Sequence, residues 1–193
     1  DRFIRFFPRS VTLGPNESQV VKVQLIRSGE LETGEYRSHF YFRAVPEINP
    51  AGEKEEKRDT TSISVRLTPV FGITIPVIIR VGELTAKTEI TNLSLDTDQN
   101  GQFILSMTFN RTGNASVYGD LTVDHLSPDG RITRVGIANG LAVYTPNTVR
   151  HFRLILNKTQ GVDFSSGTLK VTYSAPSDTK PQKFAEAELR LKQ

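Results

Sequence analysis

The chain has 193 residues, of which 37% are hydrophobic, and a formal net charge of +3. This length and apolar content are enough for a buried core and exclude a disordered chain. The charge is spread almost evenly along the sequence, and no apolar run approaches ~20 residues, so neither a nucleic-acid-binding arm nor a transmembrane helix is predicted. The absence of cysteine excludes disulfides, thiolate catalysis and Cys-ligated metal centres.

Alternation of apolar and polar residues with a period of two predicts strands over most of the first half. The expected strands are Phe3–Leu13, Gln19–Arg27, Tyr36–Val45, Ser62–Thr68 and Val70–Val81. The last of these is unusually long and apolar, and its apolar residues of one parity are Phe71, Ile73, Ile75, Val77 and Ile79. The stretch 49–59 is the most polar in the chain and is predicted to be a loop.

After Leu84 the alternation starts again. The expected strands are Thr88–Leu95, Phe103–Asn110, Tyr118–Leu126, Ile132–Ile137, Ala142–Tyr144, Arg150–Leu156, Thr168–Tyr173 and Phe184–Leu191. Turn signals separate them, including a predicted turn at Asn139-Gly140. The Ala-Glu repeats of the last segment would also suit a helix, but its alternation favours a strand.

These signals predict an all-β protein of two immunoglobulin-like β-sandwich domains, residues 1–82 and 83–193, joined by a short hinge. An immunoglobulin-like sandwich needs about seven strands, and the first half supplies fewer. The first domain is therefore expected to be incomplete in this chain, or to take strands from another chain.

The segments Phe6–Val23, Gly34–Pro46 and Val70–Arg80 resemble the first domain of the PapD-like periplasmic pilus-assembly chaperones. In that family a strand ending in Pro leads to Leu-x-Pro-Gly-x-x-Gln, similar to the stretch from Leu13 to Gln19. A later strand ends in Val-Pro or Ile-Pro, similar to Val45-Pro46. The resemblance covers residues 3–82, and it implies that the first three strands of the domain would lie before Asp1.

The resemblance implies a non-enzymatic periplasmic chaperone without cofactor or metal. Such chaperones hold a secreted pilin-like or surface protein subunit that lacks a final strand, with an outer-membrane usher as a further candidate partner. The long strand 70–81 would add to the subunit through main-chain hydrogen bonds. The residues expected to fill pockets in the subunit are Phe71, Ile73, Ile75, Val77 and Ile79. No binding of nucleic acid and no insertion into a membrane are expected.

The sequence departs from the family at the pair of basic residues that holds the carboxylate of the subunit's C-terminus. The Arg of the first strand is absent from the chain, and Pro76 stands where the family has a Lys. Arg80 stands where the family has an Arg in an inter-domain salt bridge. Glu35 is near the position of its acidic partner, but out of step in the alignment.

Other residue groups suggest chemistry only weakly. His39, His125 and His151 lack the spacing of metal ligands. The stretch from Asp96 to Gly101 resembles the start of a calcium loop, but Met107 stands at the twelfth position, where a Glu is required, so a plain turn is favoured. Asp120 and Asp124 share a strand face, as a glycosidase pair could, but solvated carboxylates are commoner.

Five arginines could form a basic face on the second domain: Arg111, Arg131, Arg134, Arg150 and Arg153. No aromatic residues are interleaved with them, so a solvated sheet face is expected rather than a nucleic-acid site. The alternative to a chaperone is a structural or adhesive surface protein, in which the strand 70–81 is buried within its own domain.

Overall fold

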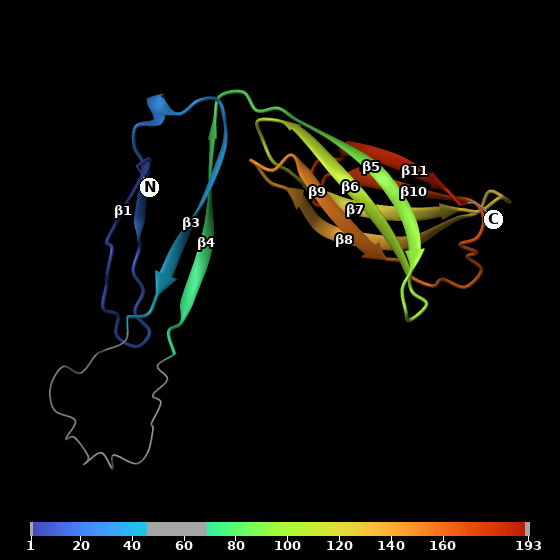
Figure 1. Cartoon of the computed structure of the whole chain (residues 1–193). Coiled ribbons are helices and arrows are strands. Elements are labelled where there is room, and N and C mark those ends of the chain that lie inside the picture. Colours follow the sequence, from blue (N-terminus) through green and yellow to red (C-terminus); the bar gives the residue numbers. More distant parts are fainter. Residues whose placement is uncertain (1, 46–68, 192–193) are drawn as a thin grey trace, which may run out of the picture. The chain divides into compact units, whose positions relative to one another are not determined.

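The computed structural model describes residues 2–45 and 69–191. These residues form an all-β protein of eleven strands and one 3-10 turn, Ser28–Glu30, which confirms the prediction that the chain is all-β (Figure 1). The expected strand Ser62–Thr68 and the polar loop 49–59 lie outside the described residues. Among the described residues, no helix has the length and apolar character needed to cross a membrane.

The chain divides into two compact units. One contains residues 1–35 and 80–193, and the other contains residues 36–79. Two strands, β3 (Gly34–Arg43) and β4 (Gly72–Val81), cross the division. The chain thus passes from one unit to the other at two places, whereas the sequence predicted one boundary near residue 82.

The larger unit contains an antiparallel β-sandwich (Figure 1). One sheet has the order β5-β6-β9, and the other has the order β11-β10-β7-β8. The strands of the first sheet are β5 (Ala86–Thr97), β6 (Phe103–Gly113) and β9 (Val149–Ile155). Those of the second are β7 (Val117–Leu126), β8 (Ile132–Val143), β10 (Thr168–Ser174) and β11 (Lys183–Arg190).

Alternate residues of the central strands form the core of the sandwich. On β6, β7 and β10, every second side chain points inward, and seven of these inward side chains have no solvent exposure: Leu105, Phe109, Leu121, Val123, Leu169, Val171 and Tyr173. Burying an aliphatic or aromatic side chain of this size stabilises a fold by about 1.5–3 kcal/mol. The period-two alternation in the sequence therefore reflects the two faces of each strand.

Strand β8 corrects one prediction. The expected turn at Asn139-Gly140 is instead a bulge within a single continuous strand. Two residues, Asn139 and Gly140, lie opposite Asp120 of β7, and Gly140 adopts a φ of 69°. The Asp120 carboxylate accepts a hydrogen bond from the Gly140 N–H at 2.9 Å. A glycine with positive φ suits a bulge as well as a tight turn, so Asn-Gly alone could not distinguish them.

Strand β11 follows the prediction, because the ambiguous C-terminal segment is a strand rather than a helix.

The first two strands are shorter than predicted. β1 (Ile4–Phe7) pairs with β2 (Lys22–Leu25), and β1 ends where Pro8, which has no N–H, follows Phe7. Before Ile90, the buried residues in the described ranges are Gly34 and Glu35.

Candidate functional site

Strand β4 contains four of the five residues predicted to bind a partner, and the fifth, Phe71, directly precedes it. It is continuous from Gly72 to Val81 and is rich in β-branched residues, which favour extended backbone. Its apolar residues are most exposed at the start of the strand: Phe71, just before the strand, is 77% exposed, Ile73 is 68% exposed and Ile75 is 48% exposed. Val77 and Ile79 are half-buried. An apolar strand this exposed lacks cover over much of its length.

The register of β3 against β4 follows from one main-chain bond. The N–H of Ala44 donates to the carbonyl of Phe71 at 2.8 Å, and the two strands run antiparallel (Figure 1). Glu35 lies nine residues before Ala44, and Arg80 lies nine residues after Phe71. The antiparallel register therefore places Glu35 opposite Arg80. These two side chains form an ion pair at 3.3 Å, so the register holds at both ends of the ladder.

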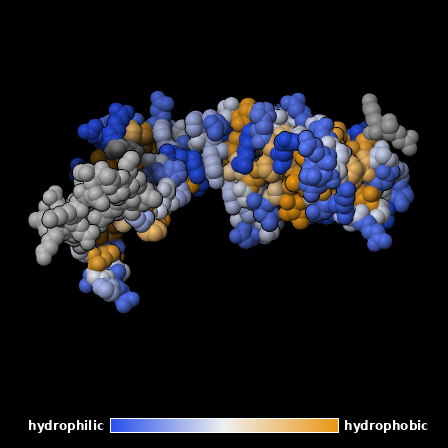
Figure 2. Space-filling model, turned by 60° about the horizontal axis from the view of Figure 1, so that its bottom comes forward, coloured by the Kyte–Doolittle hydropathy of each residue, from blue (hydrophilic) through white to orange (hydrophobic). Residues whose placement is uncertain are grey.

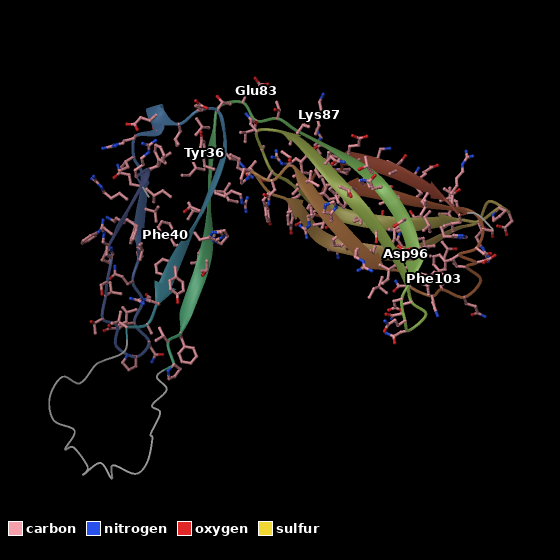
Figure 3. All side chains as sticks on the ribbon, viewed as in Figure 1. Tyr36, Phe40, Glu83, Lys87, Asp96 and Phe103 are labelled. Atoms are coloured by element: carbon pink, nitrogen blue, oxygen red, sulfur yellow. The ribbon has the colours of Figure 1, made fainter. Side chains whose placement is uncertain are left out.

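This register places aromatic residues of β3 beside the predicted residues of β4. Residues that are paired across an antiparallel ladder share a face of the sheet. The face therefore combines the five predicted residues with Tyr36, Phe40 and Phe42, and we call these eight residues the apolar face. The rings of Phe40 and Phe42 are 6.2 Å apart. Figure 3 labels Tyr36 and Phe40 along β3.

The opposite face of the β3–β4 sheet is largely polar and basic. It combines Arg37, His39, Tyr41 and Arg43 of β3 with Thr74, Pro76, Ile78 and Arg80 of β4, of which Ile78 is an exposed apolar residue. The ring of Tyr41 covers Gly72, where an added Cβ would come within 2.5 Å of a ring carbon. A side chain at position 72 would therefore have to displace the exposed ring of Tyr41. The contrast between the two faces makes this sheet amphipathic.

Glu35 and Arg80 lie where β3 and β4 begin and end in the larger unit. The Glu35 side chain is 1% exposed, and the Arg80 side chain is 63% exposed. Glu35 also accepts a hydrogen bond from the Ser116 hydroxyl. Glu35 and Arg80 are thus in contact, although the resemblance did not align Glu35 with the acidic partner of this arginine. The inter-domain role of Arg80 stays a prediction.

The turn between β6 and β7, residues 113–116, holds both neighbouring segments. Asn114 accepts from the Thr85 N–H at 2.8 Å and donates to the carbonyl of Glu83 at 3.1 Å. The main-chain carbonyl of Asn114 accepts from the Glu35 N–H at 2.9 Å. Nothing in the sequence pattern pointed to this turn, since its contacts join residues far apart in the chain.

An open depression of about 670 Å³ lies in the larger unit beside this turn. Three basic residues, Arg80, Lys87 and Lys183, contribute to its lining, together with Tyr118 and Phe184. Arg80 is paired with Glu35, and Lys183 is paired with Glu186 at 3.2 Å. Hydrogen bonds from Lys183 and Lys170 lower the pKa of Glu186 below its usual value.

The candidate glycosidase pair has structural roles instead. Asp120 binds the bulge of β8, and Asp124 forms an ion pair with Arg134 at 2.5 Å. The hydrogen bonds that the Arg134 guanidinium donates to the Asp124 carboxylate raise the pKa of Arg134. Each carboxylate therefore has a partner within its own sheet.

Two of the histidines, and the stretch that resembles a calcium loop, also form hydrogen bonds within the sandwich unit. His125 is buried and its Nε2 lies 2.9 Å from the carbonyl of Ser166, whereas His151 contacts Thr108 Oγ1 at 3.1 Å. Asp98 accepts from the N–H groups of Asn100 and Gln102, which makes 98–102 a capped turn. Across the described ranges, no group of three or more His, Asp or Glu residues could hold a metal ion.

The five arginines do not form a common basic face. Arg111 is buried, and its guanidinium donates to the carbonyls of Asn147, Gly113 and Ala115. Arg131 donates to the Gly161 carbonyl at 2.6 Å, and Arg150 donates to the Ala142 carbonyl. Most of these charges therefore stabilise loops and strand ends. In Figure 2, apolar and hydrophilic residues are interspersed over the visible surface.

Comparisons with known proteins give no family for this chain. No protein-family model matches it, and no curated protein matches it. Among solved structures, it is similar to the crystal structure of DesR, a beta-glucosidase from Streptomyces venezuelae in complex with D-glucose. The identity is 8%, the TM-score is 0.37, and the match covers 58% of this chain. The match spans 16% of the length of that protein.

Proposed function

We propose that this protein is a non-enzymatic, chaperone-like protein that binds a secreted pilin-type or surface subunit by adding β4 to it as a strand. The observation that carries the proposal is the apolar face, where Ile73 and Ile75 of the ten-residue strand β4 are exposed, together with Phe71 just before it. A subunit that lacks a strand presents both a free sheet edge and an apolar groove, and β4 complements both features.

The binding energy has two sources in this proposal. Main-chain hydrogen bonds along β4 give affinity that depends little on sequence, and side chains of one parity fill pockets in the subunit. Full burial of an isoleucine is worth about 1.5–3 kcal/mol, so the exposed residues of the apolar face could supply most of the affinity. A periplasmic location and an outer-membrane usher as a further partner belong to the same proposal, and they rest on the resemblance of residues 3–82.

A paired substitution on β4 tests the proposal. Ile73→Asp with Ile75→Asp places two negative charges on the apolar face, and Thr74→Asp places one negative charge between these positions on the opposite face. The tagged full chain is incubated with a periplasmic extract, and bound proteins are identified by mass spectrometry. We expect a small β-rich subunit to bind the unchanged chain and the Thr74→Asp variant, and to be lost from the double variant.

The alternative is a structural or adhesive surface protein in which the apolar face packs within its own domain. The amphipathic β3–β4 sheet supports this reading too, because a half-buried sheet has the same two faces. Circular dichroism and thermal unfolding distinguish the two functions. A double variant that keeps its fold but loses its subunit supports the chaperone; one that unfolds, with no subunit bound by the unchanged chain, supports the alternative.

A further inference from the structure

The outer edge of β4, on the side away from β3, has an interruption at Pro76. In an antiparallel ladder, main-chain groups point alternately toward the neighbouring strand and away from it. Because the Ala44 N–H bonds to the Phe71 carbonyl, Phe71 and every second residue after it point toward β3. Gly72, Thr74, Pro76, Ile78 and Arg80 then direct their main-chain groups to the outer edge.

The far end of the ladder supports this assignment independently. The Glu35 N–H donates to the Asn114 carbonyl, and the Glu35 carbonyl accepts from Thr145 Oγ1. Both main-chain groups of Glu35 therefore point away from β4. Arg80 lies opposite Glu35 in the same register, so its own main-chain groups point to the outer edge.

Pro76 therefore costs the β3–β4 ladder no hydrogen bond. Its missing N–H lies on the outer edge, and this explains how β4 continues through a proline. The outer edge has N–H donors at Gly72, Thr74, Ile78 and Arg80, with the proline ring at its centre. Among the described residues, β3 is the strand that pairs with β4, so this edge has no strand on it there.

We propose that Pro76 prevents the outer edge of β4 from pairing with the same edge of a second copy. The segment from Val70 to Ile79 contains no charged residue and is rich in β-branched side chains, a composition that favours self-association of strands. In a symmetric pair each copy contributes one proline, so two ladder bonds are lost at the interface. This inference concerns pairing between copies, and it does not depend on the proposed chaperone function.

The test is Pro76→Val in the full chain, followed by sedimentation velocity over a concentration series. Restoring two ladder bonds should raise the association constant of the dimer by about 4- to 100-fold, since each bond is worth about 2- to 10-fold. Pro76→Thr is the second variant if the valine reduces solubility. The double variant T74P/P76V moves the ring to another outward position and should return the chain to the wild-type state.

Hydrogen exchange identifies the edge used by the dimer. The amides of Gly72, Thr74 and Ile78 should become protected in Pro76→Val, whereas those of Ile73 and Val77, which already face β3, should change little. The proposal is overturned if neither variant at position 76 self-associates more than the wild type, or if T74P/P76V does not reverse the association. A wild-type dimer with protected Gly72 and Thr74 amides would also overturn it. Failure to recover a subunit in the extract experiment leaves this result unaffected.

Discussion

At the scale of single residues, Tyr173 shows how one buried polar group is satisfied in the sandwich. Its side chain has no solvent exposure, and its hydroxyl donates to the Leu141 carbonyl at 2.7 Å. The ring packs against Phe109 and Phe184, with centroids 5.2 Å and 5.4 Å away. Burial raises the pKa of the Tyr173 hydroxyl well above its usual value, because the phenolate would lose its hydration.

We predict that Tyr173→Phe lowers the free energy of unfolding by about 1–2 kcal/mol at neutral pH, because the Leu141 carbonyl loses a donor. A tyrosine whose pKa is raised by folding stabilises the protein below the pKa of the unfolded chain, about 10, and this contribution is lost as the pH rises further. The difference between the two proteins should therefore shrink above pH of about 10. Urea unfolding at several pH values measures it. A difference that grows with pH would contradict the prediction.

At the scale of elements, the turn 113–116 connects three parts of the larger unit. Its Asn114 side chain bonds to Thr85 and Glu83, and its Ser116 hydroxyl bonds to Glu35. The segment that precedes β5 and the first residues of β3 are thus held by one turn. Short polar residues suit this role because they bond to main-chain groups nearby.

We predict that Asn114→Ala lowers the free energy of unfolding by about 1–2 kcal/mol. The Thr85 N–H and the Glu83 carbonyl lose their side-chain partner, and water replaces it only partly. Hydrogen exchange at the Thr85 amide should become faster than in the wild type. Asn100→Ala is the matched control, because Asn100 contributes its main-chain N–H to the turn at Asp98. Equal exchange at Thr85 in both variants would contradict the role of Asn114.

Alternation predicted most strands of the sandwich, because each has one face in the core. It failed where a contact depends on chain-distant neighbours. The Asn139-Gly140 bulge needs Asp120 opposite it, and the Glu35–Arg80 pair needs the β3–β4 register. The residues of the apolar face on β4 were predicted from parity alone, whereas their companions Phe40 and Phe42 required the same register.

At the scale of the whole molecule, burial is concentrated in residues after Ile90. The described residues that form the hydrophobic core come from the sandwich strands and their loops. The ladders β1–β2 and β3–β4 each have two strands. Two-stranded sheets are marginally stable without further cover. The stability of the chain is therefore expected to differ along its length.

We predict that amides of β6, β7 and β10 exchange with solvent several orders of magnitude more slowly than those of β1 and β2. Exchange from a packed core requires global unfolding, whereas a short exposed ladder opens locally. Hydrogen exchange followed by mass spectrometry, with peptides from each strand, measures the contrast. Comparable protection in β2 and β7 would mean that the first strands are covered as well as the sandwich is.

The attachment points of residues 36–79 have a consequence for how this chain can vary. Both ends of the segment are fixed at neighbouring places, since Glu35 and Arg80 are in contact. An inserted segment whose two ends lie next to each other can be lengthened, shortened or exchanged without moving the residues at which it is attached. The sandwich and its turn 113–116 thus hold both ends of a segment, residues 36–79, that can be replaced. Another antiparallel strand pair could therefore be grafted between residues 35 and 80 in place of β3 and β4.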